Sequence, residues 1–180
     1  MKEVPSQGFS LLELLLVLTI LGIVAVAAVP SLSSGNQKRL ELAASEVAGA
    51  MRYARDEALR TGDPRGFELQ LNAPRIRVIG ADTSTNPWTP RYDVEHPGVH
   101  GFYDVDLSSR SYAGIDGATR NTVFHGNCND PDLIFFDANG MPSCGDSGGA
   151  LVDQYDVTLV FGSRSLIVSL HGISGRVRIQ

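Results

Sequence analysis

Charged side chains are almost absent from a long stretch near the start of the chain. Between Phe9 and Val29 the only ionisable side chain is that of Glu13. These 21 residues would form a helix about 31 Å long, close to the hydrocarbon thickness of a bilayer. A second apolar run of this length is absent, which excludes a protein that crosses a membrane several times. We therefore predict one transmembrane helix at residues 9–29.

Internal repeats and low-complexity segments are also absent, and the sequence has only two cysteines. The chain has 180 residues, of which 43% are hydrophobic, enough for one modest globular domain after the apolar run. A net charge of −5 argues against a general binder of polyanions. With one span at residues 9–29, we expect everything after Pro30 to lie on one side of the membrane.

Glu13 needs an explanation, because a carboxylate in lipid costs at least a few kcal/mol unless it has a partner. One interpretation is an ordinary secretory signal peptide, with Ala25-Val26-Ala27 as its cleavage site, although the apolar run is longer than a typical signal core. The other is cleavage after Gly8, which frees the amine of Phe9 four residues before Glu13. The same pair formed between neighbouring helices would fix the axial register of an assembly.

The stretch Gly8-Phe9-Ser10-Leu11-Leu12-Glu13 resembles the class III signal of type IV pilins and type II secretion pseudopilins. This resemblance implies cleavage between Gly8 and Phe9 by a prepilin peptidase, methylation of the Phe9 amine, and a role for Glu13 in filament assembly. It implies three kinds of partner: other pilins or pseudopilins, the peptidase, and an inner-membrane assembly platform. Pro30 falls where many pilins have a helix-bending proline. The leader, residues 1–8, departs from many relatives because Lys2 is its only basic residue.

An amphipathic helix is predicted to continue the apolar one through residues 30–61. Gly62 and Pro64 form a helix-ending signal, and Ser33-Ser34-Gly35-Asn36 could loosen the join between the two helical parts. We expect the apolar stripe to pack on a sheet. Its members recur at intervals of three and four: Leu40, Ala44, Val47, Met51, Ala54 and Ala58.

The remainder, residues 62–180, is predicted to be a β-rich domain. Alternating apolar residues predict hairpins around Asn72-Ala73-Pro74 and Gly162-Ser163. The pattern from Gly80 to Asp132 is irregular. The other expected strands are 99–105, 133–136 closed by Asn139-Gly140, and 176–179 after a turn between Gly172 and Gly175. The fold class is therefore α+β, a long N-terminal helix packed on an antiparallel sheet or sandwich.

The part from Leu133 through Asn139-Gly140 to Gly175-Arg176-Val177-Arg178 resembles the C-terminal domain of the FimT/GspH group of minor pilins and pseudopilins. The resemblance implies a pilin fold with the C-terminal domain in the bacterial periplasm, incorporated into a type IV pilus or a type II secretion pseudopilus. The chain alone does not separate these two machines.

Cys128 and Cys144 are predicted to form a disulfide in the oxidising periplasm. The bond would tie the loop before Leu133 to the loop after Gly140, with about 3 kcal/mol of stabilisation from loop closure. The alternative is two unpaired thiols, because the sequence does not show the Cα distance that a disulfide requires.

The sequence does not support protease chemistry or a calcium site. Cys144 to Val152 resembles the nucleophile loop of chymotrypsin-like proteases, with Ser147 after Gly-Asp, but the four histidines lack the required context and the domain is too short. The acidic residues do not follow the spacing of an EF-hand, and a solvated acidic loop explains them. We expect no enzyme, no metal and no cofactor. The four histidines are His96, His100, His125 and His171, and the acidic residues are Asp104, Asp106, Asp116, Asp130 and Asp132.

Basic residues are segregated at the C-terminus. Residues 157–180 contain Arg164, Arg176 and Arg178 and no acidic residue, whereas residues 62–156 contain six arginines and fourteen acidic residues. Arg176 and Arg178 would share one face of a strand, and guanidinium groups suit phosphate oxygens. In FimT-like pilins a Gly-Arg-x-Arg element is associated with DNA capture in natural transformation, and Gly175, Arg176 and Arg178 match it. DNA is thus a candidate partner; the alternative is a solvated polar strand.

Overall fold

A computed structural model of the chain describes residues 10–109, 115, 117–125, 128, 130, 132–144 and 151–180, without the side chains of residues 25–34 and 124–125. The chain divides into two compact units. The first ends at Asn36, and the second runs from Gln37 to Gln180.

One helix, α1, runs from Leu11 to Thr61. At its start, the carbonyl of Ser10 accepts the N–H groups of Glu13 and Leu14 at 3.0 and 3.2 Å. At its end, Gly62 has a φ of 74° and donates its N–H to the carbonyl of Ala58 at 2.9 Å. A glycine can adopt this left-handed conformation without a steric penalty, so the predicted helix end is confirmed. The helix continues through residues 33–36 without interruption.

No helix in the described part of the chain has an apolar segment long enough to cross a membrane. The span at residues 9–29 remains a prediction.

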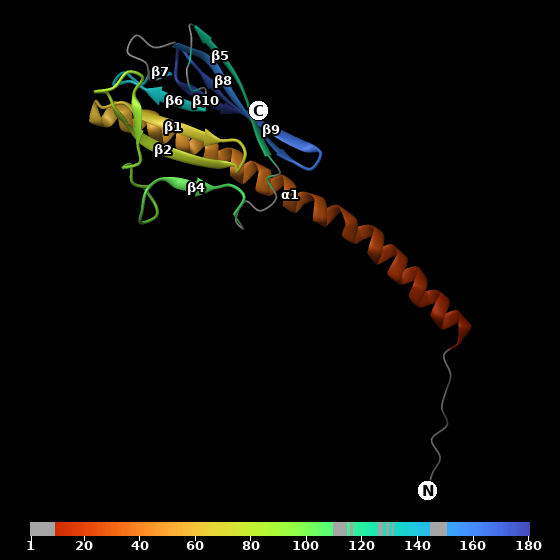
Figure 1. The fold of residues 1–180 in the computed structure, drawn as a ribbon. Helices are drawn as coiled ribbons and strands as arrows, with labels where there is room; N and C mark the ends of the chain where they lie inside the picture. Colours follow the sequence, from red (N-terminus) through yellow and green to blue (C-terminus); the bar gives the residue numbers. More distant parts are fainter. Residues whose placement is uncertain are drawn as a thin grey trace. The chain divides into compact units, whose positions relative to one another are not determined.

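The predicted apolar stripe forms one side of the core of the second unit. All six of its residues, from Leu40 to Ala58, are buried. They pack against side chains from the sheet, among them Phe67, Tyr155 and Val177. Burial of these apolar side chains supplies the main stabilisation that holds the helix on the sheet. The sheet lies alongside the C-terminal part of α1 in Figure 1, and the predicted α+β class is confirmed.

Ten strands form one antiparallel sheet among the described residues. Nearest neighbours along it follow the order β10-β9-β8-β7-β6-β1-β2-β3, with β4 paired to β2 and β5 paired to β8. The bounds are β1 Arg65–Gln70, β2 Arg75–Asp82, β3 Thr89–Arg91, β4 Asp104–Asp106, β5 Gly117–His125, β6 Leu133–Phe136, β7 Pro142–Ser143, β8 Leu151–Phe161, β9 Arg164–His171 and β10 Arg176–Ile179.

The predicted hairpins β1–β2 and β8–β9 are present, as are strands β6 and β10. The expectation for residues 99–105 was wrong in extent, because only Asp104–Asp106 pairs as a strand, with β2. The preceding residues form a loop in which Glu95 makes an isolated bridge to Phe102. Strand β5 was not predicted, although it pairs with β8 along nine residues.

A disulfide joins Cys128 to Cys144, with the two Cα atoms 5.6 Å apart. This distance lies within the range that disulfide geometry allows. The two cysteines stand on either side of β6, so the bond closes the segment that carries this buried strand.

Candidate functional site

Glu13 lies in the first turn of α1, where the surrounding side chains are apolar and exposed. Leu11, Leu12, Leu14, Leu15 and Leu16 are all more than half exposed, so the apolar surface surrounds the helix instead of forming one stripe. A helix that is apolar on all sides needs an apolar environment to bury it. The predicted processing residues Gly8 and Phe9 lie outside the described residues.

The basic C-terminal element is strand β10, which stands at one end of the strand order and pairs only with β9 among the described strands. Val177 points into the core, while Arg176 and Arg178 are exposed. Because side chains alternate along a strand, the two arginines lie on the same, outer face of the sheet. This is the arrangement that the sequence predicts.

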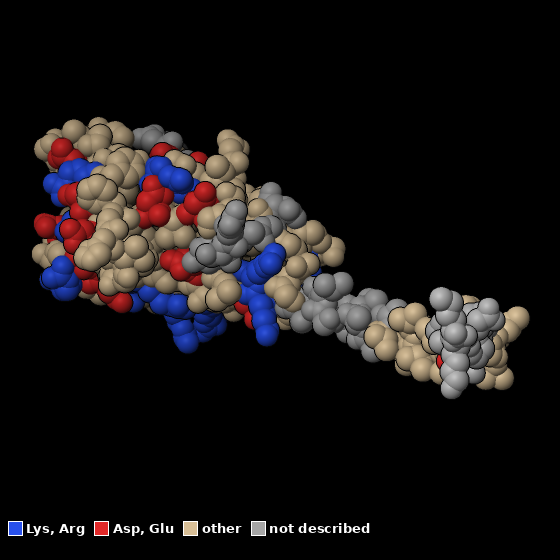
Figure 2. All heavy atoms as spheres, turned by 90° about the horizontal axis from the view of Figure 1, so that it is seen from below, with Lys and Arg blue, Asp and Glu red and all other residues tan. Residues whose placement is uncertain are grey.

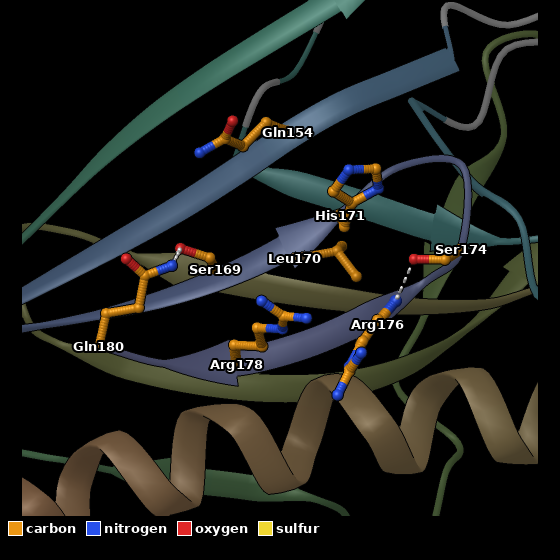
Figure 3. Close-up of a pocket in the computed structure, with 8 residues that line it drawn as sticks. All are labelled: Gln154, Ser169, Leu170, His171, Ser174, Arg176, Arg178 and Gln180. Carbon is orange, nitrogen blue, oxygen red and sulfur yellow. Dashed lines mark hydrogen bonds between the residues drawn. The ribbon is translucent and has the colours of Figure 1, made fainter.

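A shallow depression of about 500 Å³ lies beside these arginines. Figure 3 shows Arg176 and Arg178 on β10 beside Ser169 and His171 of β9, with Gln154 of β8 beyond them. The strand register places Arg176 opposite His171 and Arg178 opposite Ser169. None of the described lining residues is acidic; they are Gln154, Ser169, Leu170, His171, Ser174, Arg176, Arg178 and Gln180.

The arginines of strands β1, β2, β3 and β5 pair with carboxylates. Arg75 and Arg77 both contact Asp104, and Arg77 also contacts Glu68 at 3.3 Å. The other ion pairs among the described residues are Arg60–Glu57, Arg65–Asp63, Arg91–Asp93 and Arg120–Asp132. None of these pairs involves Arg176 or Arg178. In Figure 2 blue and red groups are intermixed over part of the domain, while other blue groups have little red beside them.

Two arginines on α1 reach the same region and were not predicted as site residues. Arg52 Nη2 donates to the backbone carbonyl of Val177 at 3.1 Å. Arg55 extends between Gly140 and Gly175, and its Nε is buried without a hydrogen-bond partner among the described residues. Neither arginine forms an ion pair with a described carboxylate. The one signal in the sequence was their i, i+3 spacing, which puts two like charges on one helix face.

Gly175 has a steric role at this place. Its φ is +58°, and a Cβ built on it would lie 2.6 Å from Arg55 Nε and 3.0 Å from the carbonyl oxygen of Gly140. Both the backbone conformation and the lack of space therefore require a glycine. The glycine of the predicted Gly-Arg-x-Arg element brings the turn before β10 close to Arg55 of α1.

Arg164 does not join Arg176 and Arg178. It lies at the start of β9, opposite Phe161, and its Nη1 donates to Gln37 Oε1 at 3.0 Å. The pairing between the two strands ends with the hydrogen bonds between Ile167 of β9 and Gln180, the residue after β10. Arg164 stands three residues beyond Ile167, or about 10 Å along the strand. Strand β9 thus lies alongside β10, whereas Arg164 itself lies beyond the paired part of the two strands. A contact of Arg164 with DNA stays a prediction.

The acidic residues considered as metal ligands have protein partners where they are described. Asp104 binds Arg75 and Arg77, Asp106 accepts two hydrogen bonds from Ser108, and Asp132 pairs with Arg120. Within the described residues, no group of three or more His, Cys, Asp or Glu side chains could hold a metal ion. Asp116 and the loop with Ser147 lie outside the described residues, as does the side chain of His125.

Comparison with known proteins links the N-terminal segment to a family and the domain to a fold. Residues 5–29 match the family described as the prokaryotic N-terminal methylation motif. The domain is similar to the minor pseudopilin EpsH from the type 2 secretion system of Vibrio cholerae, with a TM-score of 0.51 at 10% identity over 79% of this chain and 96% of that one. This second similarity concerns the fold alone.

Two relatives are similar in sequence as well. Type II secretion system core protein G of Escherichia coli K12 is 31% identical over 127 residues, which are 62% of this chain and 83% of that protein. Type II secretion system protein H of Xanthomonas campestris pv. campestris is 39% identical over 75 residues, 41% of this chain and 44% of that protein. With its N-terminal motif and its fold, the chain belongs to the type IV pilin-like family of pilins and pseudopilins.

Proposed function

We propose that this protein is a minor, non-enzymatic subunit of a type II secretion pseudopilus or a type IV pilus. A prepilin peptidase removes residues 1–8, the amine of Phe9 is methylated, and the apolar part of α1 is held in the bacterial inner membrane with the domain in the periplasm. An assembly platform in the inner membrane then adds the subunit to a filament of other pilins or pseudopilins.

One observation carries this proposal: the start of α1, which lies within the matched methylation motif, is apolar on all sides except for Glu13. Such a surface is stable in lipid or among other apolar helices, and not in water. Both environments occur in the life of a filament subunit, first the membrane and then the bundle of helices. Glu13 serves in the second environment, as partner for the Phe9 amine of a neighbouring subunit.

Assembly is tested by following the chain in cells that contain the complete secretion or pilus machinery. We expect it in the filament fraction that is sheared from cells, and in the membrane fraction alone when the prepilin peptidase is deleted. Absence from filaments in the presence of the peptidase would contradict the proposal. The neighbouring genes separate the two machines, because effector-secretion genes indicate a pseudopilus and competence genes indicate a pilus.

A second candidate function is the capture of duplex DNA during natural transformation. The observation that favours it is the contrast in charge neutralisation: arginines of β1 to β5 bind carboxylates, whereas Arg176 and Arg178 do not bind any among the described residues. Unpaired arginines on one strand face can contact phosphates without a large cost of breaking existing ion pairs. The carboxylate of Asp156 opposes the binding of phosphate. Asp156 lies on β8, two strands away from Arg178, and accepts a hydrogen bond from Gln154 Nε2 at 2.7 Å.

A titration of labelled duplex DNA at several salt concentrations tests this candidate. We expect weak binding without strong sequence preference, since strand arginines reach phosphates but do not enter a groove. Replacing Arg176 and Arg178 with alanine should reduce the slope of log K against log salt by about two units, one for each contact. Arg91→Ala serves as the control, because Arg91 is half exposed but paired with Asp93. Equal binding by the double variant would remove the DNA candidate.

A further inference from the structure

We infer that the DNA-contacting surface is wider than strand β10 and includes Arg52 and Arg55 of helix α1. This inference rests on the second candidate function and extends it to two residues more than a hundred positions away in the sequence. We call the four residues Arg52, Arg55, Arg176 and Arg178 the basic surface.

Arg52 is held at the outer edge of β10. Gln180, directly after β10, and Ile167 of β9 form a hydrogen-bonded pair, in which they exchange both N–H···O bonds. Hydrogen-bonded and non-bonded pairs alternate in an antiparallel ladder, so the carbonyl of Val177 points away from β9. Arg52 Nη2 donates a hydrogen bond to this carbonyl oxygen. One guanidinium nitrogen thus anchors Arg52 beside the strand, and its other donors remain for an anion.

Arg55 is anchored by packing instead of hydrogen bonding. Its Nε is buried, and two glycines with positive φ, Gly140 and Gly175, leave room for its side chain. Its Nη1 and Nη2 atoms have no hydrogen-bond partner in the described part of the chain and do not belong to its buried unpartnered atoms. Arg55 Nη1 and Nη2 therefore reach solvent, beside the turn that leads to Arg176.

None of the four arginines of the basic surface belongs to an ion pair found among the described residues, and Asp56, four residues after Arg52 on α1, does not form one of these pairs either. Arg52 and Arg55 do not form any of the ion pairs found among the described residues, whereas Arg60, on the same helix, binds Glu57 through two hydrogen bonds. The nearest carboxylate in the Gly140 turn, that of Asp137, accepts the backbone N–H groups of Asn139 and Met141 at 2.8 Å. Four arginines without carboxylate partners on two adjoining elements suit a polyanion whose charges are closely and regularly spaced.

Anchoring lowers the entropic cost of binding. A free arginine side chain loses rotamer freedom when it is fixed against a ligand. Arg52 and Arg55 have lost part of that freedom already in the folded protein, one through Val177 and the other through the two glycines. They are therefore suited to contact phosphates first, with Arg176 and Arg178 adjusting to them.

The experiment is a DNA titration against salt with the full chain in a nonionic detergent. Arg52→Met together with Arg55→Met removes both charges but keeps most of the side-chain volume between the glycines. We expect the slope of log K against log salt to fall by about two units, and about one unit for each single change. Arg52→Lys with Arg55→Lys should keep the slope of the wild type. Arg60→Met, on the same helix but at a neutralised position, is the matched control and should leave the slope unchanged.

The possible failures are distinguishable. If the wild type does not bind DNA at low salt, the DNA candidate fails and this inference falls with it. If the wild type binds and Arg176→Ala with Arg178→Ala lowers the slope, but the two methionine changes do not, the DNA candidate stands and the inference is wrong. A loss of affinity at constant slope for Arg55→Met would assign Arg55 a purely positioning role and would also overturn the inference.

Discussion

Single residues decide how the C-terminal strand meets the helix. Gly140 and Gly175 adopt φ angles of +73° and +58°, and both lie against the Arg55 side chain. A glycine at either place serves the backbone turn and the close approach together. The Gly-Arg-x-Arg element thus combines one residue with a structural role and two that are exposed, and these roles can be separated by mutation.

The first prediction concerns Gly175→Ala. The new Cβ would meet Arg55 and force a residue with a side chain into the left-handed region, so we expect a loss of about 1–3 kcal/mol in the free energy of unfolding. In an Arg55→Ala background the clash with Arg55 should disappear and the cost should fall, while the approach to the Gly140 carbonyl oxygen and the strained φ remain. Urea unfolding of the four chains in this double-mutant cycle measures the coupling. Additive changes would contradict the close approach.

The second prediction concerns acid titration of Asp106. Ser108 donates its Oγ–H and its backbone N–H to Asp106 Oδ1 at 2.6 and 2.8 Å, and these bonds hold the pKa of Asp106 below its ordinary value of 3.8. The folded pKa is below the unfolded one, so the stabilisation is complete above pH 3.8 and is lost as the pH falls through the folded pKa. Ser108→Ala should raise this pKa, as followed by NMR. Ser84→Ala, which acts on Asp82, should leave it unchanged.

At the scale of elements, the sequence predicts what local patterns determine. The stripe from Leu40 to Ala58 and the four apolar residues of β6 were identified because their period or continuity is strong. Strand β5 was missed because Gly117–His125 has few apolar residues, and its pairing with the distant β8 defines it. The basic surface was found only in part for the same reason. Arg52 and Val177 are 125 positions apart, and no local pattern predicts that contact.

The third prediction tests the disulfide that encloses β6. Cys128→Ser with Cys144→Ser should lower the free energy of unfolding by about 3 kcal/mol. The two cysteines are 16 residues apart, and without the bond the unfolded chain regains the entropy that the closed loop had removed. Urea unfolding gives the change, and treatment of the wild type with a reductant should give the same loss. The reductant should not affect the double variant. Equal unfolding midpoints for the oxidised wild type and the double variant would contradict a stabilising bond.

At the scale of the whole molecule, two different surfaces serve two different environments. The start of α1 presents apolar side chains on all sides and one carboxylate, whereas the domain has a buried core and a charged surface. This division is what a filament subunit requires, with one part buried among helices and the other in water. The family membership of the chain accords with it.

The fourth prediction concerns Glu13→Ala. The change removes the only charge of the apolar run, so insertion into the membrane should be unchanged or slightly favoured. Incorporation into filaments should fall, because the Phe9 amine of a neighbouring subunit loses its partner. The amount of the variant in membrane and sheared filament fractions provides the measurement. Leu14→Ala, at the neighbouring position, is the control and should assemble normally; wild-type amounts of Glu13→Ala in filaments would refute the role of Glu13.

The central claim is that the chain is processed as a pilin-like subunit, and the intact mass of the protein recovered from cell membranes tests it most directly. Cleavage between Gly8 and Phe9 with methylation predicts a mass that lacks the eight residues Met1–Gly8 and gains one methyl group, and this species should be absent from cells without prepilin peptidase. An N-terminus near Ala28 would identify an ordinary signal peptide and contradict the account.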